Sequence, residues 1–310
     1  MLLRQLEYLV ALARERHFAR AAEACHVSQP SLSAAIQRLE HELDVPIVRR
    51  GRRYEGLTPE GEVVLAWAHR ILAERDALRQ ELSALRGGLT GTLRLGVVPT
   101  ALPVASLLTT PFCERHPRAG VTLQSLSSEE IRHGLAEFEL DAAMTYLDDD
   151  TLRQVRRFPL YEERYVLLTP VDGPLGHSDT ASWSQAATLP LCLLNSRMRN
   201  RRIMDECFAA EGATAAPAIE SDSVAGLYAH LPGGRWSCVI SHAWLHMFGV
   251  PEGMRVVPLE GPAHGPRVGL VIARTEPTSV LADALVAVAR EAGVRDALDQ
   301  LLHSYLGGRG

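Results

Sequence analysis

The hydrophobic positions of this 310-residue chain follow one period before about residue 90 and another after it. In the first part, apolar residues recur every three or four positions, which is the spacing of amphipathic helices. From Thr92 onward, short apolar runs such as 92–98 and 267–273 alternate with helical patterns. Alternation of this kind is typical of α/β domains, in which helices cover both faces of a parallel sheet. The pattern predicts helices first and an α/β fold after them.

Residues 18–58 predict two short helices joined by a tight turn. The first helix runs from Phe18 to Cys25 and the turn covers 26–28, so that the second helix begins near Gln29 and Pro30. Proline suits a first helical turn, whose N–H groups have no partner within the helix. An apolar stripe along the second helix would pack it onto the first. The stripe consists of Leu32, Ile36, Leu39 and Leu43.

The opposite face of this second helix is a candidate DNA-reading surface. A helix-turn-helix places the N-terminal residues of its second helix against base edges in the major groove. Ala34 can contact a thymine methyl group there, and Gln37 can pair with adenine. The residues expected to contact bases or phosphates are Gln29, Pro30, Ser31, Ser33, Ala34, Gln37 and Arg38. The alternative is an ordinary amphipathic helix with a solvated polar face.

An arginine-rich hairpin is predicted directly after this helix. Arg49, Arg50, Arg52 and Arg53 surround Gly51. Guanidinium groups so close together repel one another unless an anion faces them, and a phosphate backbone supplies that anion. A solvated run of charge is the alternative. We expect Arg50, Arg52 and Arg53 to contact DNA.

The run AAEACHVSQPSLSAAIQRLEHEL, followed by RRGRRYEGLTPEG, resembles the winged helix-turn-helix of LysR-type bacterial transcriptional regulators. This chain departs from the family pattern at Cys25, at Asp44 in place of glycine, and at 47–48 in place of Leu-Phe. None of these positions lies on the outward face of the second helix, so the departures concern local packing. The resemblance implies a DNA-binding regulator whose effector domain is two-lobed, like a periplasmic binding protein.

A long helix is predicted from Pro59 to Arg86, capped by Thr58 and ended by the glycines at 87–88. Its heptad seam has one charged interruption and consists of Val64, Ala68, Ile71, Arg75, Leu78, Leu82 and Leu85. A seam of this kind favours dimerisation. The alternative is a helix lying on its own domain. A dimer would present two recognition helices to an inverted repeat, and we expect a dimer of dimers on an interrupted palindrome.

We therefore predict an α/β protein with an N-terminal all-α winged helix-turn-helix, a long linker helix and a two-lobed, type 2 periplasmic-binding-protein-like effector domain. The expected boundaries are 1–58 for the DNA-binding domain, 59–88 for the linker and 89–310 for the effector domain. Lobe I would comprise 92–160 and 268–310, and lobe II 161–267. Two crossings between lobes leave a cleft, the preferred place for a small ligand.

Candidate effector-binding residues stand where predicted strands meet helices. Hydroxyl groups and free helix N–H groups at such junctions bind carboxylates and similar anions. In lobe II, the segment NSRMRNRR (195–202) brings four arginines ahead of a helix. The candidates are Thr100, Ser127, Ser128, Thr145, Tyr146, Asn195 and Arg202. The alternative is that Thr100 only caps a helix and the arginines form a solvated loop.

Composition adds limits to this picture. The formal net charge is −5, and the excess of acidic residues lies after residue 91, which suits contact with DNA through one end. No run approaches the ~20 apolar residues of a membrane span, and no signal peptide is evident, so we expect a cytoplasmic protein. His242 and His246 have a metal-like spacing but lack a third ligand. We predict no metal and no cofactor.

The five cysteines are scattered without a CxxC motif, which is typical of reduced, packed thiols. Some LysR-type proteins sense peroxide through a cysteine pair, so a redox switch using Cys192 and Cys207 is one alternative. A solute-binding protein is another, because 92–310 alone would support it. No hydrolase or nucleotide-binding motif is present, and we predict no enzyme.

The overall prediction is a transcriptional regulator whose operator binding is modulated by a small metabolite. The expected partners are double-stranded promoter DNA, further copies of the chain in a homodimer or homotetramer, a small organic anion and RNA polymerase. The segment from Asn195 to Phe208 resembles LysR-type regulators linked to formate dehydrogenase operons. This resemblance makes formate a candidate effector.

Overall fold

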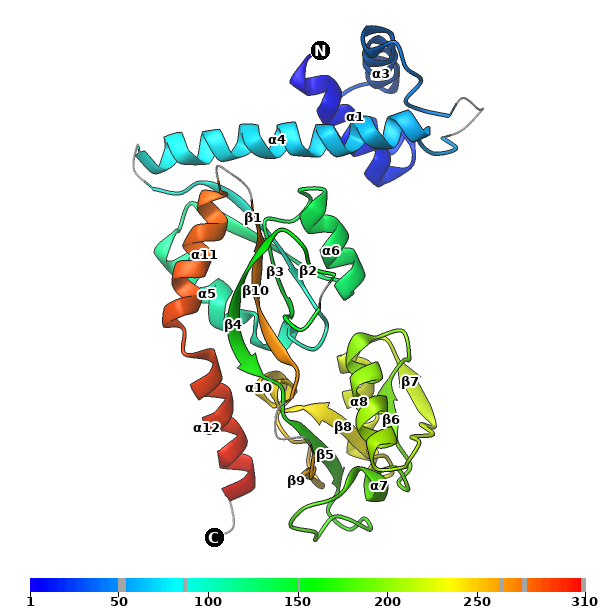
Figure 1. Cartoon of the computed structure of the whole chain (residues 1–310), viewed down its shortest axis with the longest axis vertical. Helices are drawn as coiled ribbons and strands as arrows, with labels where there is room; N and C mark the ends of the chain where they lie inside the picture. The colour runs from blue at the N-terminus through cyan, green and yellow to red at the C-terminus, as the bar shows by residue number, and fades with distance from the viewer. Residues whose placement is uncertain (50–53, 86–87, 150, 262–264, 275–277, 308–310) are drawn as a thin grey trace. The chain divides into compact units, whose positions relative to one another are not determined.

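The computed structural model describes residues 1–49, 54–85, 88–149, 151–261, 265–274 and 278–307. The chain divides into two compact units, a helical unit built on Met1–Leu89 and an effector unit that holds most of the chain after Thr90. Figure 1 labels their helices and strands. The predicted fold class, helices first and an α/β fold after them, is confirmed.

The helical unit begins with three helices, α1 (Leu3–Glu15), α2 (Phe18–Ala24) and α3 (Gln29–Leu43). The predicted turn lies between α2 and α3, where His26 adopts a left-handed backbone conformation with φ 54°. Ser28 caps α3, because its hydroxyl oxygen accepts a hydrogen bond from the Ser31 N–H at 3.3 Å. Apolar side chains from the three helices form one core, which includes Leu6, Leu9, Leu12, Ala21, Leu32, Ile36 and Leu39.

The predicted apolar stripe of α3 is buried except at its last member. Leu32, Ile36 and Leu39 are buried, whereas Leu43 is 39% exposed. The helix ends at Leu43, and Asp44 turns the chain away in a left-handed conformation. The prediction that Leu43 packs in the stripe is therefore wrong.

At the base of the predicted hairpin, the two chain segments pair through antiparallel backbone contacts. Val48 forms a bridge with Leu57, and the Arg49 N–H donates to the Gly56 carbonyl at 3.0 Å. Helix α4 (Pro59–Leu85) follows, with the predicted cap at Thr58, whose hydroxyl accepts from the Gly61 N–H at 2.9 Å.

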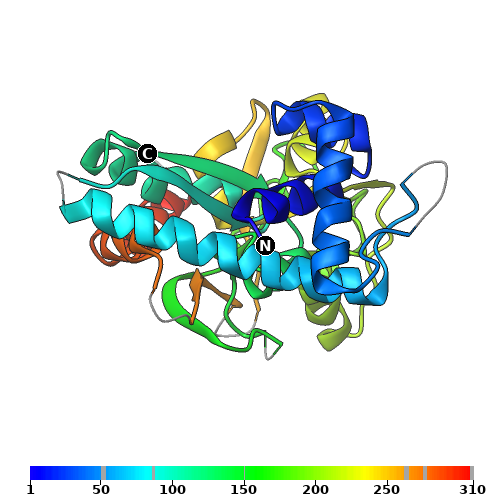
Figure 2. The ribbon, with the colours of Figure 1, turned by 90° about the horizontal axis from the view of Figure 1, so that it is seen from above.

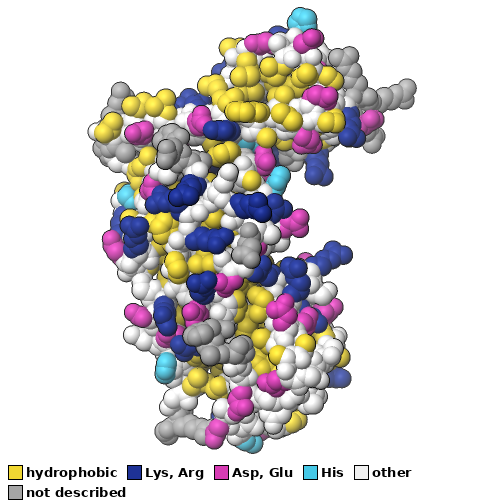
Figure 3. Space-filling model, in the orientation of Figure 1, with side chains coloured by type: hydrophobic (Ala, Val, Ile, Leu, Met, Phe, Trp, Pro, Cys, Tyr) yellow, Lys and Arg dark blue, Asp and Glu magenta, His cyan; other side chains and the backbone are white. Residues whose placement is uncertain are grey.

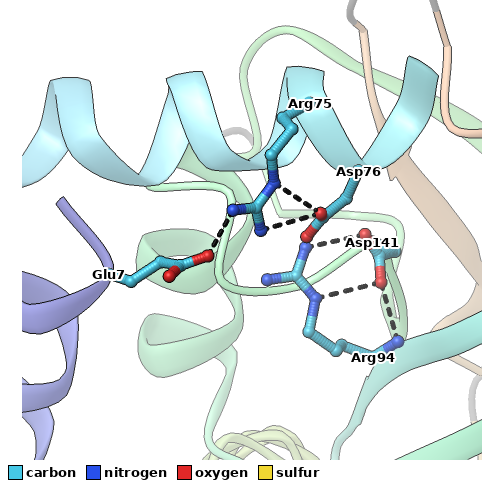
Figure 4. Close-up of polar contacts among 5 residues, drawn as sticks. All are labelled: Glu7, Arg75, Asp76, Arg94 and Asp141. Atoms are coloured by element: carbon cyan, nitrogen blue, oxygen red, sulfur yellow. Dashed lines mark hydrogen bonds and ion pairs between the residues drawn. The ribbon is translucent and has the colours of Figure 1, made fainter. Parts of the chain in front are cut away.

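Helix α4 belongs to the helical unit over its first half. Ala68 is fully buried in the core with α1–α3, and Figure 2 shows these three helices gathered at one end of α4. Arg75, the charged interruption of the seam, pairs with Glu7 of α1 and with Asp76 (Figure 4). The first half of the seam therefore packs on its own unit, as the alternative expected.

The second half of the α4 seam is open to solvent. Leu78 is 57% exposed, Leu82 47% and Leu85 80%. Trp67 lies on the exposed side of the first half and is also more than half exposed. Helix α4 thus keeps a row of large apolar side chains that the chain itself does not cover.

The first sheet of the effector unit has the strand order β2 (Ala119–Ser125), β1 (Gly91–Val97), β3 (Ala142–Tyr146), β10 (Arg267–Ala273), β4 (Val155–Glu162). Strand β1 runs parallel to β2 and β3, but β10 is antiparallel to both of its neighbours. The sheet is mixed because the chain returns to it from the second sheet through β10. The prediction of purely parallel sheets is wrong.

Helices cover both faces of this first sheet, with α6 (Ser128–Ala136) on one side and α5 (Ser106–Arg115) and α11 (Val280–Glu291) on the other (Figure 1). Helix α5 is preceded by a 3₁₀ turn, η1 (Leu102–Val104). Arg94 of β1 forms a double ion pair with Asp141, which holds the approach to β3 beside β1 (Figure 4).

The second sheet is antiparallel over β8 (Cys238–Ser241), β5 (Tyr165–Pro170) and β9 (Met254–Pro258). Beside it, β6 (Cys192–Leu194) pairs in parallel with β7 (Ile219–Ser221), and Leu191 bridges to Ser237. Helices α7 (Trp183–Ala186) and α8 (Arg199–Ala210) pack on this layer, and α9 (Val224–Tyr228) follows β7. Trp183 and Phe208 meet edge to face in its core.

A helix contacts both sheets, in addition to the chain segments that cross between them. Helix α12 (Val294–Gly307) packs against β4 of the first sheet and β9 of the second. The remaining elements are η2 (Leu231–Gly233), η3 (His242–Trp244) and α10 (Leu245–Phe248). Among the described helices, none combines the length and the apolar character needed to cross a membrane.

Gly61 sets the approach of α4 to the hairpin. A Cβ atom at this position would lie 2.1 Å from the Ile47 carbonyl oxygen, so backbone would have to move. We expect Gly61→Ala to lower the free energy of unfolding of the full chain by about 1–3 kcal/mol. Urea denaturation measures this. Gly233→Ala is the control, because a Cβ there meets nothing within 4 Å. Equal effects of both changes would contradict the prediction.

Candidate DNA-binding surface and effector site

The outward face of α3 presents most of the predicted DNA-reading residues to solvent. Gln29, Pro30, Ser31, Gln37 and Arg38 are exposed, whereas Ser33 and Ala34 are half-buried. The Ser31 hydroxyl lies 2.8 Å from the hydroxyl of the cap residue Ser28. The first turn of α3 is therefore held by its own side chains, and Gln37 and Arg38 beyond it are exposed to solvent.

The predicted wing arginines fall outside the described residues at 50, 52 and 53. Arg49, which precedes them, is exposed, and its guanidinium donates to the Leu57 carbonyl at 2.9 Å. Arg49 thus ties the two strands of the hairpin together at its base.

In the effector unit, five polar side chains meet in a buried cluster that we call the hub. The hub consists of Thr100, Tyr146, Glu163, Tyr165 and Asn200. The Tyr146 hydroxyl lies 2.8 Å from that of Thr100 and donates to Glu163 Oε2 at 3.3 Å. The Tyr165 hydroxyl and the Asn200 Nδ2 also donate to this oxygen, at 3.0 and 3.1 Å. One carboxyl oxygen therefore collects three donors.

The hub joins the two sheets. Thr100 follows β1 and Tyr146 ends β3, both in the first sheet, whereas Tyr165 begins β5 of the second. Asn200 lies in the first turn of α8. Glu163 stands in the short segment between β4 and β5, where the chain crosses from one sheet to the other.

Burial dominates the acid–base behaviour of the hub. Glu163 is 1% exposed, and loss of water raises the pKa of its carboxyl to about 7, although hydrogen bonds from Tyr165, Ser241, Tyr146 and Asn200 oppose the rise. The same loss of water, reinforced by Glu163, raises the pKa of the Tyr146 and Tyr165 hydroxyls, which remain donors.

A close backbone contact fixes the crossing beside Glu163. The Glu163 N–H donates to the Pro266 carbonyl at 2.9 Å, so the two crossing segments are hydrogen-bonded. A Cβ on Gly265 would lie 1.7 Å from the Glu163 carbonyl oxygen, which requires glycine at that position. His242 packs next to them and accepts from the Arg164 N–H through Nδ1 at 3.1 Å. Burial lowers the pKa of His242 to about 4, so the ring is neutral.

Arg199 makes a second contact across the sheets. Its guanidinium pairs with Asp149 at 3.1 Å, donates to the Asp148 carbonyl at 3.3 Å and lies 5.6 Å from the centre of the Tyr146 ring. Burial opposes ionisation of Asp149, but hydrogen bonds from Thr151 and the charge of Arg199 lower its pKa. The first turn of α8 thus contacts the first sheet through two neighbouring residues, Arg199 and Asn200.

The predicted effector residues are only partly brought together. Thr100 and Tyr146 are bonded to each other in the hub. Ser127 instead exchanges hydrogen bonds with Glu130 as the cap of α6, and Asn195 accepts from the Arg197 N–H at 3.1 Å. Ser128, Thr145 and Arg202 lie outside the hub. The hydroxyl oxygens of Ser128 and Thr145 are buried and have no partner among the described residues, whereas Arg202 is exposed.

Sequence reasoning missed Glu163, Tyr165 and Asn200. The available signal was the polar string YEERY between two apolar runs, and an asparagine among arginines in NSRMRNRR. In Figure 3 the surface is indented between α6 and α8, with basic side chains on both sides. Arg132 of α6 and Arg197 and Arg202 near the start of α8 are exposed.

The cysteines are arranged differently from the predicted redox pair. All five are free. Cys192 of β6 and Cys238 of β8 are both fully buried, and the Cys238 thiol hydrogen-bonds Cys192. Burial raises the pKa of Cys207, which lies in α8. Cys192 therefore interacts with the thiol of Cys238.

A helix-turn-helix with an exposed recognition face, followed by a two-sheet α/β domain, is the organisation of a DNA-binding transcriptional regulator. Residues 3–62 match the model of the bacterial regulatory helix-turn-helix protein, lysR family, and residues 86–294 match that of the LysR substrate binding domain. The chain belongs to the LysR family of transcriptional regulators.

Several known proteins are similar over nearly the whole chain. A probable hydrogen peroxide-inducible genes activator of Streptomyces viridosporus is 30% identical over 293 residues, covering 94% of each chain. A full-length OxyR variant from Pseudomonas aeruginosa has a TM-score of 0.76 at 27% identity and covers 96% of this chain and 97% of its own. CbnR in complex with its target DNA has a TM-score of 0.67 at 21% identity, covers 94% of this chain and 100% of its own, and shares the fold.

The raised pKa of Glu163 predicts a pH effect on stability. Between its ordinary pKa of 4.5 and about 7, the folded chain holds a proton that the unfolded chain releases. The stabilisation is complete below pH 4.5 and is lost as the pH rises through 7. Over this window, the wild-type protein should lose up to about 3 kcal/mol relative to Glu163→Gln, which cannot ionise. Urea denaturation of both proteins measures it.

The comparison must be made between the two proteins, because His242 acts in the opposite sense. Its lowered pKa costs stability as the pH falls from 6.5 toward 4. Both proteins share this contribution, so it cancels in the difference. Parallel pH profiles would show that Glu163 ionises normally in the folded chain.

Proposed function

We propose that this regulator reads an inverted repeat through α3 and the wing, and that a small ligand bound in the effector unit controls the reading. The main observation in support is that α3 is amphipathic. Its inner face buries Leu32, Ile36 and Leu39, whereas Gln37 and Arg38 on its outer face are exposed. A recognition helix held this way from behind can enter a major groove without rearranging. Its DNA partner implies a cytoplasmic location.

In the proposed complex, Gln37 and the small residues Pro30 and Ala34 face base edges. Gln29, Ser31, Ser33 and Arg38 flank them, and the wing residues Arg50, Arg52 and Arg53 contact phosphates. Phosphate contacts supply salt-dependent affinity, whereas base contacts supply sequence preference. Activation or repression would then depend on where the bound protein stands relative to RNA polymerase.

Two exposed surfaces support a homodimer and a homotetramer. The first is the apolar row of α4, at Trp67, Leu78, Leu82 and Leu85. The second is a groove between α5 and β2 that Thr109, Cys113, Val121 and Leu123 help to line. A dimer presents the same recognition helix twice, which matches an inverted repeat in the DNA.

The effector proposed here is a small organic anion, with formate as the first candidate. The side chains of Arg132 on α6 and of Arg197 and Arg202 near the start of α8 are exposed and would attract an anion. Within the described part of the chain, the hydroxyl oxygens of Ser128 in α6 and Thr145 in β3 are buried without a partner. Unpartnered polar atoms in a buried site are places that a ligand or water can satisfy.

Response to hydrogen peroxide is a second candidate function, favoured by the names of the relatives. The sequence-predicted pair, Cys192 and Cys207, would have to form a disulfide. Against this, Cys192 is fully buried and its thiol partner is Cys238, whose hydrogen bond lowers the pKa of Cys192. Burial raises the pKa of Cys207, which disfavours the reactive thiolate there. We therefore rank the peroxide response below control by a small ligand bound in the effector unit.

The DNA contacts are tested on duplexes selected from a random-sequence library. Gln37→Ala should relax base preference at one position of each half-site, because a bidentate contact is worth about 1–3 kcal/mol. Changing Arg52 and Arg53 together to alanine should weaken binding to all sequences and flatten its salt dependence. Fluorescence anisotropy at several salt concentrations measures both.

Matched controls are Gln124→Ala, on an exposed position of β2, and the double change of Arg235 and Arg295, exposed arginines of the effector unit. These variants should bind DNA as the wild type does. If Gln37→Ala keeps the selected consensus unchanged, α3 does not read bases through this residue. An unaltered salt slope would remove the wing from the phosphate contacts.

The effector is sought by thermal unfolding of the full chain with formate and other small carboxylates. Ligand at about 100 times its dissociation constant adds about 2.7 kcal/mol of stability and raises the melting temperature. Arg202→Ala should lose the shift, whereas Arg235→Ala should keep it. A hit that also changes DNA affinity supports an effector. No hit, together with a Cys192–Cys207 disulfide after peroxide treatment, would favour the redox candidate instead.

A further inference from the structure

Glu163 is a buried acid that receives hydrogen bonds from both sheets. No positively charged side chain among the described residues forms an ion pair with its carboxyl. Its partners are Tyr146 from the first sheet, Tyr165 and Ser241 from the second, and Asn200 from α8. Among the described residues, no arginine side chain is hydrogen-bonded or ion-paired to its carboxyl. The surrounding charges are committed elsewhere, in the pairs Arg164–Asp299, Arg199–Asp149 and Arg267–Asp148.

Apart from these ion pairs, the tyrosines and the histidine on the adjoining elements are neutral at physiological pH. Tyr161 on β4, Tyr146 on β3 and Tyr165 on β5 keep their protons because burial raises their pKa. His242, which follows β8, is uncharged because burial lowers its pKa. Within the hub, Glu163 is therefore the group whose charge can change.

We propose that Glu163 is a proton site that latches the two sheets of the effector unit together. With a proton on its carboxyl, the hub favours the arrangement seen here. Loss of the proton favours withdrawal of the first turn of α8 from Tyr146. This regulation rests on the proposed function, because α8 also carries the residues proposed to bind the effector.

The direction of the effect follows from solvation. An ionised carboxylate loses its water in the closed hub and regains it when α8 withdraws, so ionisation favours the open arrangement. The hub does not fully replace that water. The two amide hydrogens of Asn200 have three acceptors within 3.1–3.2 Å, so its hydrogen bonds to Tyr146, Glu163 and Tyr165 cannot all form at once.

Asn200 also explains why α8 is the element that moves. Asn200 is 2% exposed, and its Oδ1 has no hydrogen-bond partner among the residues that the structure describes, so its place in the hub depends on what Nδ2 binds. The other contact of this turn, between Arg199 and Asp149, lies nearer the surface, where the Arg199 side chain is 28% exposed. An exposed ion pair holds two elements together weakly.

The test is hydrogen–deuterium exchange of the full-length protein without DNA or effector, at about pH 6 and about pH 8.5. After correction for intrinsic exchange rates, protection of peptides from α8 in the wild type should fall at least about tenfold at the higher pH. Protection of α11, which does not touch the hub, should stay constant. Glu163→Gln should keep α8 protected at both pH values.

Glu206→Gln is the matched control, because it removes an exposed carboxylate from the same helix and leaves the hub intact. It should behave as the wild type. Tyr146→Phe removes the hydroxyl that links Thr100, Glu163 and Asn200, and α8 should then be less protected at both pH values. This variant keeps the proposal testable if Glu163→Gln fails to fold.

Two results would overturn the latch. One is α8 protection that does not change with pH in the wild type, and the other is the same change in Glu163→Gln. Neither depends on DNA or effector binding, so a failed DNA-binding or ligand test would leave the exchange result standing. Conversely, a regulator that binds DNA and effector normally can still lack the latch.

Discussion

A carboxyl group cannot leave water without acquiring partners, and this requirement organises the effector unit around Glu163. The acid sits where the chain passes between two sheets, and the side chains that donate hydrogen bonds to it come from β3, β5, β8 and α8. Thr100 has no bond to the acid itself but orients the Tyr146 hydroxyl. The hydrogen bonds of the hub therefore position its members relative to one another. They connect the segment between β4 and β5 with the end of β3 and the start of α8.

In the helical unit, the core contacts of α3 are all made by its apolar face. Helix α3 has its buried face against α1 and α2, and the Ser28 cap fixes its first turn. The first half of α4 closes the same core from below through Ala68, and Arg75 adds an ion pair to α1. The core contacts that hold α3 therefore lie on the side opposite its reading face.

The DNA-binding half was predictable because its signals are local. A proline in the first turn, a serine before it and an apolar stripe at helical spacing all lie within sixteen residues of each other. The hub was not, because its members are brought together only by the fold. Asn200 and Arg202 are two positions apart, but two positions are about 200° around a helix, so one enters the hub and the other faces solvent. The pairing of Cys192 with Cys238 likewise depends on strand neighbours far apart in sequence.

Ala68 is as deeply buried as any residue of α1 to α3, so the core of the helical unit extends past Thr58 into α4. A fragment cut after Thr58 would expose Leu9, Leu12 and Ile47 to water and lose the helix that seals them. The shortest piece that retains this core must extend through Leu72, roughly to the middle of α4. Attempts to isolate the DNA-reading part should therefore carry half of the linker with it, and proteolysis of the intact chain should spare that half.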